Sequence, residues 1–208
     1  TKCAFDQIET YTKCKKIEVG RGVVEIGDYT MNDTRGLESM SLPNTVARLG
    51  DPFYENYDLK AFIQPRSCED LQLSYAYGLN RICLAGNTMS NICAADNTGL
   101  SNIIIPDSIT ELPSEFLSGC NGIFSGIIIP ASVLKINSKA FKSCGKVANY
   151  NFSWHESIPA LANIDAFSSA IYRECKIIVP DALYNGWIAT TNSSTYADKI
   201  VKASEYNG

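Results

Sequence analysis

The sequence predicts a repeat solenoid in which each coil carries one short parallel β-strand and returns through a turn or a short helix. Two stretches carry the prediction: Leu100–Ile109 and Phe124–Val133 share three isoleucines, a proline, a serine and a closing aliphatic residue, 24 residues apart. A fixed period of this length is typical of coils that stack on one another, because each coil alone has almost no core.

The same unit can be traced over most of the chain. It consists of an apolar residue, two spacers, an apolar residue, one spacer, an apolar residue, and then proline or a small residue. The closing residues of eight such units lie at positions 20, 43, 65, 85, 106, 130, 153 and 180, between 20 and 27 residues apart. Residues 1–180 are therefore expected to form a solenoid of about eight coils.

The first half of each unit is expected to be a strand. Successive strand residues point to opposite faces, so two apolar positions separated by one residue both point inward and the residue between them points outward. In one clear copy, Ile127 and Ile129 would point inward and Ile128 outward. Proline after the strand ends it, because proline has no amide hydrogen to donate.

The second half of each unit is marked by an apolar residue, a turn and a pair such as Ala140-Phe141 or Phe53-Tyr54. We expect this part to turn back as a short helix or an irregular arc, with the aromatic side chain filling the core between coils.

The pattern changes after Pro180. Leu183, Trp187 and Ile188 would lie roughly on one side of a helix, and Tyr196 and Ile200 are four residues apart. The last coil of a solenoid must be shielded from water and from edge pairing. Residues 181–208 are therefore predicted to be a helical C-terminal cap.

The best copy of the repeat also carries a family resemblance. Residues 127–144 read Ile-Ile-Ile-Pro-Ala-Ser-Val-Leu-Lys-Ile-Asn-Ser-Lys-Ala-Phe-Lys-Ser-Cys. This resembles the unit of the BspA-like leucine-rich repeat family, and the resemblance covers roughly residues 3–180. It implies a leucine-rich-repeat solenoid and a surface-exposed recognition protein of bacteria, or of some of their phages and protozoa.

The resemblance also bears on the eight cysteines. It implies that Cys120 and Cys144 occupy equivalent core positions of successive coils as reduced thiols. Disulfide pairing of Cys3 with Cys14, or of Cys83 with Cys93, stays open. No metal or cofactor site is expected, because the chain has no Cys-x-x-Cys motif and only one histidine.

Composition excludes several classes of function. The net charge is −4, the isoelectric point is about 5.1, and the basic residues are scattered, which argues against a nucleic-acid-binding surface. The apolar runs are only a few residues long, so we expect no membrane insertion. The chain starts at Thr1 without a leader, so it is expected to be a processed product or a fragment.

Catalysis is not expected. Ser153, His155 and Glu156 are close in sequence, but neighbouring residues of an extended segment point apart, and no nucleophile elbow is present. His155 is interpreted as a surface-loop residue. Nothing singles out a carboxylate pair for glycoside hydrolysis.

Binding has a positive indication. The outward residues of the middle coils form an apolar stripe from Ile63 to Ile128, and such a surface is often an interaction site, although isoleucine also simply suits a strand. Tyrosines in the turns, Tyr54, Tyr57, Tyr75 and Tyr77, offer a second candidate surface for a glycan or protein, with core filling as the alternative. The candidate binding residues on the outward strand face are Ile63, Arg81, Asn102, Ile104, Ile128, Asn149 and Asn151.

These features predict a non-catalytic recognition module for adhesion or receptor binding, located extracellularly on a cell surface or a virion. Its partner would be a host-cell surface protein or glycan. The alternative is a structural subunit whose apolar strand face is buried against another subunit of a surface or virion assembly.

Overall fold

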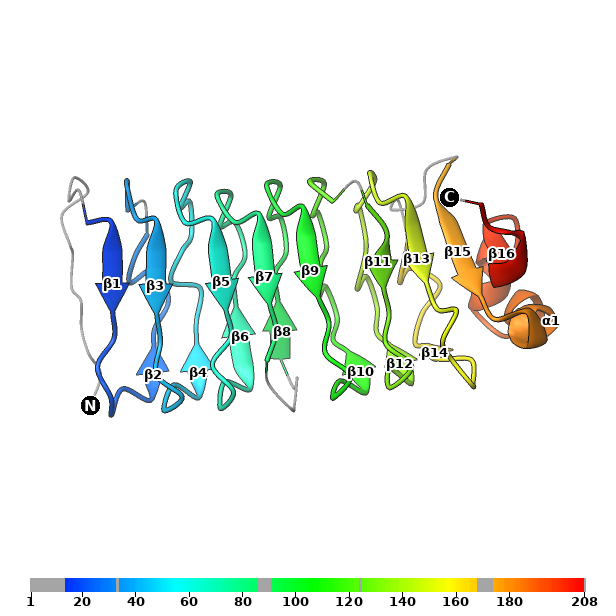
Figure 1. The fold of residues 1–208 in the computed structure, drawn as a ribbon, viewed down its shortest axis with the longest axis horizontal. Helices are drawn as coiled ribbons and strands as arrows, with labels where there is room; N and C mark the ends of the chain where they lie inside the picture. The colour runs from blue at the N-terminus through cyan, green and yellow to red at the C-terminus, as the bar shows by residue number, and fades with distance from the viewer. Residues whose placement is uncertain (1–13, 33, 86–90, 124, 168–173, 208) are drawn as a thin grey trace.

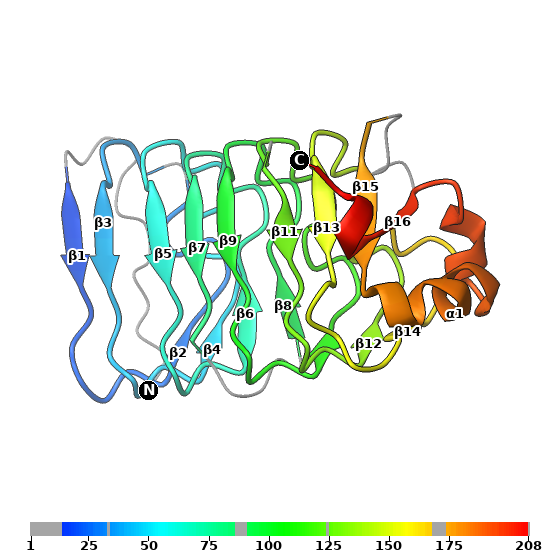
Figure 2. The ribbon, with the colours of Figure 1, turned by 45° about the vertical axis from the view of Figure 1, so that its right-hand side comes forward.

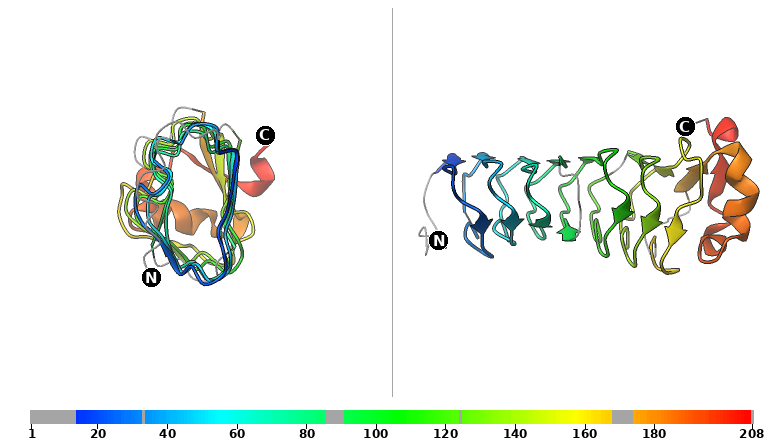
Figure 3. Two further views of the ribbon diagram at one scale, coloured as in Figure 1. Left: turned by 90° about the vertical axis from the view of Figure 1, so that its left-hand side faces the viewer. Right: turned by 90° about the horizontal axis from the view of Figure 1, so that it is seen from below.

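The computed structural model describes residues 14–32, 34–85, 91–123, 125–167 and 174–207. The described residues form an elongated solenoid whose coils are stacked along the long axis (Figure 1). Seen along that axis, the coils superimpose as one closed loop (Figure 3). The expectations for Cys3 and Phe124 concern residues outside the described ranges.

One row of strands runs along one side of the solenoid and contains the strand predicted for each coil. The strands pair in parallel in three ladders, β1-β3, β5-β7-β9 and β11-β13-β15, and the last ladder continues into β16 (Ile200–Lys202) of the C-terminal segment. The row consists of β1 (Lys16–Glu18), β3 (Ser39–Ser41), β5 (Ala61–Ile63), β7 (Arg81–Cys83), β9 (Asn102–Ile104), β11 (Ile127–Ile128), β13 (Asn149–Asn151) and β15 (Lys176–Val179). The predicted solenoid of parallel strands is confirmed.

A second row of short strands, which the sequence did not indicate, lies in the returning half of the coils. It consists of β2 (Glu25–Ile26), β4 (Arg48–Leu49), β6 (Asp70–Gln72), β8 (Asn91–Cys93), β10 (Glu111–Leu112), β12 (Lys135–Ile136) and β14 (Ala160–Leu161). Turns complete each coil, and no helix precedes Asp181 in the described ranges. A strand residue advances about 3.3 Å along the chain and a helix residue only about 1.5 Å. With 20 to 27 residues in each coil, extended segments therefore reach further around a core than helices would.

The core is a column of apolar side chains between the two rows. Inward residues such as Leu59, Phe62 and Ile82 are buried, as the alternation predicts. Phe141 is fully buried among aromatic rings, with centroids 4.9 Å from Tyr150, 5.4 Å from Phe167 and 6.3 Å from Phe116. Because these rings belong to successive coils, the column holds the coils to one another.

A ladder of buried hydrogen-bond donors runs beside the apolar column. Asn97 Nδ2 donates to the carbonyl of Leu73 at 2.7 Å, and Asn56 Nδ2 donates to the carbonyl of Thr34 at 2.9 Å. The Cys120 and Cys144 thiols donate to carbonyls of the coils before them, at 3.0 and 2.8 Å. These thiols are therefore structural, as expected, and weak donors as well as small apolar groups.

No disulfide forms among the described cysteines. Cys14, Cys83 and Cys93 are free thiols, so Cys83 and Cys93 are not paired. They lie on β7 and β8, in different rows of strands. Cys120, Cys144 and Cys175 are buried free thiols as well.

The C-terminal segment closes one end of the solenoid (Figure 3). It contains η1 (Asp181–Leu183), α1 (Tyr184–Ala189), η2 (Ser193–Tyr196), β16 (Ile200–Lys202) and η3 (Ala203–Glu205). Trp187 of α1 is fully buried, with its ring centroid 4.9 Å from that of Phe152. The helical cap is confirmed, but Ile200 lies in a strand that pairs with β15. The division of the chain at Pro180 stays a prediction.

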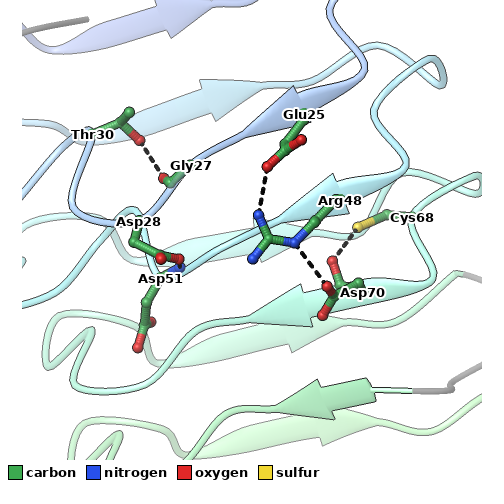
Figure 4. Close-up of polar contacts among 8 residues, drawn as sticks. All are labelled: Glu25, Gly27, Asp28, Thr30, Arg48, Asp51, Cys68 and Asp70. Atoms are coloured by element: carbon green, nitrogen blue, oxygen red, sulfur yellow. Dashed lines mark hydrogen bonds and ion pairs between the residues drawn. The ribbon is translucent and has the colours of Figure 1, made fainter. Parts of the chain in front are cut away.

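Charged side chains form a short ladder on the outside of the second row (Figure 4). Arg48 on β4 lies in register between Glu25 and Asp70, and its guanidinium contacts their carboxylates at 2.5 and 2.9 Å. These pairs are partly exposed, so each contributes at most about 1 kcal/mol to the stability of the fold.

Asp51 lies near this ladder, in the turn after β4 (Figure 4). Its Oδ1 atom is buried without a hydrogen-bond partner among the described residues. Burial raises the pKa of Asp51 from 3.8 to about 6; hydrogen bonds from Ser74 oppose the rise, and the Asp28 carboxylate adds to it. The folded state therefore favours the protonated carboxyl.

We expect Asp51→Asn to stabilise the protein above pH 6. A raised folded-state pKa gives stability that is complete below pH 3.8 and lost as the pH rises through about 6. Because the side chain is partly solvated, the gain should be on the order of 1 kcal/mol. Urea unfolding at pH 4 and pH 7.5 checks this, with exposed Asp107→Asn as the control. An equal effect of Asp51→Asn at both pH values would contradict the account.

Candidate recognition surface

All seven candidate residues lie on strands of the first row and share its outward side, which we call the outer strand face. Ile63 and Arg81 lie on β5 and β7, Asn102 and Ile104 on β9, Ile128 on β11, and Asn149 and Asn151 on β13. The parallel register places Ile63 beside Cys83 and Cys83 beside Ile104. The structure therefore brings residues far apart in the sequence into one row.

Apolar side chains on the outer strand face are open to solvent. The exposed fractions are 71% for Ile63, 45% for Ile104 and 61% for Ile128. Cys83, between Ile63 and Ile104, is half-buried. A contiguous apolar patch on the surface of a protein often marks an interaction site. The three exposed isoleucines lie on one face, so a single partner could cover them together.

A groove of about 660 Å³ opens in this face between β9 and β11. These strands belong to separate ladders, and the spacing between them is wider than between β7 and β9 (Figure 1). The groove is apolar along its walls, where Ile104 and Ile128 contribute their side chains, and polar at Asn102, Asp107 and Ser132.

Trp154 also lines the groove, although it is not among the candidate residues predicted from the sequence. Its side chain is 69% exposed. Trp154 comes directly after Ser153, the closing residue of its repeat unit. Asp107 and Ala131 take the same position in the two preceding coils, and both are exposed. A large aromatic residue at an outward repeat position was the signal that could have identified it.

The two asparagines of β13 are less accessible than the isoleucines. Asn149 is half-buried and donates from Nδ2 to the Tyr206 hydroxyl at 3.1 Å. Gly126 makes room for it, because a Cβ at Gly126 would lie 2.2 Å from Asn149 Oδ1. Asn151 is half-buried and accepts from the Ser153 amide at 2.9 Å.

Ile178 pairs with Asn151 and so takes the outward position of the repeat on β15, but its side chain is buried. The C-terminal segment folds back across the outer strand face at β13 and β15 (Figure 2). The bond from Asn149 to Tyr206 is part of this contact. The accessible part of the face therefore ends at β11, and its exposed isoleucines lie between β5 and β11.

The interpretation of His155 as a surface residue is also wrong. Its side chain is buried, its Nε2 lies 3.2 Å from the carbonyl oxygen of Ile129, and its ring packs 5.2 Å from that of Phe152. Burial lowers the pKa of His155. This histidine is part of the packing between coils.

Within the described ranges, no group of three or more histidine, cysteine or acidic side chains could hold a metal ion. In the same ranges, no helix has the length and apolar character needed to cross a membrane.

The arrangement suits contact with another macromolecule. An exposed aromatic ring and two isoleucines surround a groove with a few polar groups at its edge, and protein interfaces combine such apolar centres with polar rims.

Comparison with known proteins identifies the repeat. The family described as "BspA type Leucine rich repeat region" matches residues 4–123 and 79–178, with six copies. The chain belongs to this family. Membership indicates a leucine-rich-repeat scaffold for protein interaction, and nothing in the comparison indicates catalysis.

Solved structures of similar fold come from bacteria. A leucine-rich repeat protein from Eubacterium ventriosum shares 17% identity over 77% of this chain and 44% of its own, with a TM-score of 0.64. One from Bacteroides ovatus shares 20% identity over 90% of this chain and 54% of its own, with a TM-score of 0.60. The chain thus spans about half the length of these proteins. No curated protein sequence matches it.

Proposed function

We propose that this chain is a non-catalytic recognition module that binds a protein partner through the outer strand face, centred on the groove between β9 and β11. The observation that carries the proposal is the meeting of Ile104, Ile128 and Trp154 at one groove. The proposed location is extracellular, on a cell surface.

The shape of this surface supports a protein partner. Tryptophan is enriched among the residues that dominate binding energy, particularly where a surrounding rim excludes water. Trp154 stands at the edge of the groove with most of its surface exposed, and the walls are apolar. A partner that inserted an apolar side chain between Ile104 and Ile128 would cover this surface and could form hydrogen bonds with the exposed side chains of Asn102 and Asp107.

A phage-displayed library of random peptides tests the proposal, because selection from such a library does not require that the natural partner be identified. The library is selected on the wild-type chain, and enriched peptides are then tested on the Trp154→Ala and Ile128→Asp variants. We expect apolar peptides to be enriched and their binding to fall about tenfold or more on each variant, the loss typical of a dominant interface residue.

Leu134→Asp is the matched control, because Leu134 is an exposed aliphatic residue and does not line the groove. Thermal melts establish that all variants fold. Equal binding of the enriched peptides to the wild type and to both groove variants would overturn the proposal.

A further inference from the structure

A second surface lies on the turns that follow the second row of strands. Tyr29 follows β2, Tyr54 and Tyr57 follow β4, and Tyr75 and Tyr77 follow β6. We call these five residues the tyrosine ledge. Ring centroids are 5.4 Å apart for Tyr29 and Tyr54, 5.2 Å for Tyr54 and Tyr75, 6.2 Å for Tyr75 and Tyr77, and 5.3 Å for Tyr77 and Tyr57. The rings therefore form one continuous series across three coils.

The tyrosine ledge is a surface feature and does not fill the core. Tyr29 and Tyr57, at the two ends of the series, are exposed, and the other three rings are half-buried. Tyr29 and Tyr75 have φ values of 57°, in the left-handed region that a bulky residue adopts only at a cost. Glycine or asparagine would make these turns more readily, so the turns themselves do not require tyrosine.

The segments that carry most of the ledge are acidic. Residues 51–58 and 74–78 carry four of the five tyrosines, and residues 95–98 form the corresponding turn of the next coil. Together these ranges contain four carboxylates, from Asp51, Glu55, Asp58 and Asp96, and no lysine or arginine; Arg35 follows the turn of Tyr29. Lys60 follows residues 51–58, and its ammonium group donates a hydrogen bond to the carbonyl of Tyr57.

Two of these carboxylates lie beside the rings. The charge of Asp96 is the main reason that the pKa of Tyr75 is raised. The pKa of Tyr77 is raised first by burial and then by its neighbours, including Glu55 and Asp96. Negative charge is therefore concentrated at the ring series, whose end residues Tyr29 and Tyr57 are exposed.

We propose that the tyrosine ledge binds a cationic peptide segment, with arginine or lysine side chains over the tyrosine rings and Glu55 and Asp96 balancing their charge. Aromatic faces attract cations, and arginine can also stack on a ring while it bonds to a carboxylate. A neutral glycan could stack on the same rings and donate hydroxyl hydrogen bonds to the carboxylates, but only a cation also gains from their negative charge. This site goes beyond the proposed function, because none of its residues lines the groove.

The test is a titration of the chain with a dye-labelled peptide of alternating arginine and serine, followed by fluorescence anisotropy at low salt. The control peptide has citrulline, a neutral analogue, in place of arginine. We expect Tyr57→Leu with Tyr77→Leu to weaken binding about tenfold, and Tyr57→Phe with Tyr77→Phe to retain it within about twofold, because phenylalanine keeps the ring face. Glu55→Gln should weaken binding and reduce its salt dependence.

Trp154→Ala should bind the arginine peptide as the wild type does, since Trp154 belongs to the groove. If the double leucine variant does not fold, Tyr57→Leu alone replaces it, because Tyr57 is largely exposed. The proposal is overturned if the arginine peptide does not bind at millimolar concentration, if the citrulline peptide binds equally well, or if the leucine and phenylalanine variants bind alike. Binding of neutral oligosaccharides at the ledge in place of the peptide would also overturn it.

Discussion

Phe141→Ala is expected to destabilise the protein by about 3–5 kcal/mol, the range observed when a buried phenylalanine is truncated in a close-packed core. The side chain is fully buried and contacts Phe116, Tyr150 and Phe167 of the coils on both sides. In a solenoid each coil is stabilised mainly by its neighbours, so a cavity at this point weakens two interfaces.

Urea unfolding followed by far-ultraviolet circular dichroism measures this loss. Leu134→Ala is the matched control, because Leu134 is 55% exposed and its truncation should change stability by no more than about 0.5 kcal/mol. A loss below about 1 kcal/mol for Phe141→Ala would mean that the aromatic column does not hold these coils together.

Asn56→Ala should cost about 2–4 kcal/mol although it removes little apolar surface. The Asn56 side chain is buried, donates to Thr34 and accepts from the backbone amides of Asp58 and Leu59, at 3.1 and 2.8 Å. Alanine would leave the buried Leu59 amide and Thr34 carbonyl, and the partly buried Asp58 amide, without these partners, and each buried group left unpaired costs about 1–3 kcal/mol.

The same unfolding experiment applies, with the exposed Asn163→Ala as the control. Hydrogen exchange at the amide of Leu59 gives a local check, because that amide should lose its protection in Asn56→Ala. Unchanged stability together with unchanged protection would show that the hydrogen bonds of Asn56 contribute nothing to the stacking of the coils.

The first strand row could be predicted from the sequence because its signal is local. Two apolar residues flanking one residue, followed by proline, determine that Ile127 and Ile129 point inward and Ile128 outward, and the structure agrees. The second row could not be predicted in this way. A strand of two residues, such as Lys135–Ile136, is too short to show any alternation and forms only because β10 and β14 pair with it.

The sequence predicted which residues of the candidate surface point outward, but not where the accessible part of that surface ends. Ile63, Ile104 and Ile128 are outward because of the repeat, whereas the burial of Ile178 depends on a C-terminal segment that folds back over β13 and β15. The groove depends on the separation of two ladders between β9 and β11, and no residue pattern indicates it. Burial of His155 likewise arises from contacts between coils.

We expect the outer strand face of this chain to be free to receive a partner and not to be buried by self-association. Light scattering after size-exclusion chromatography of the 208-residue chain tests it most directly. We predict a monomer over a wide concentration range, with Ile104→Asp eluting identically. A stable oligomer that Ile104→Asp dissociates would contradict the claim, because the face would then be buried between subunits of an assembly.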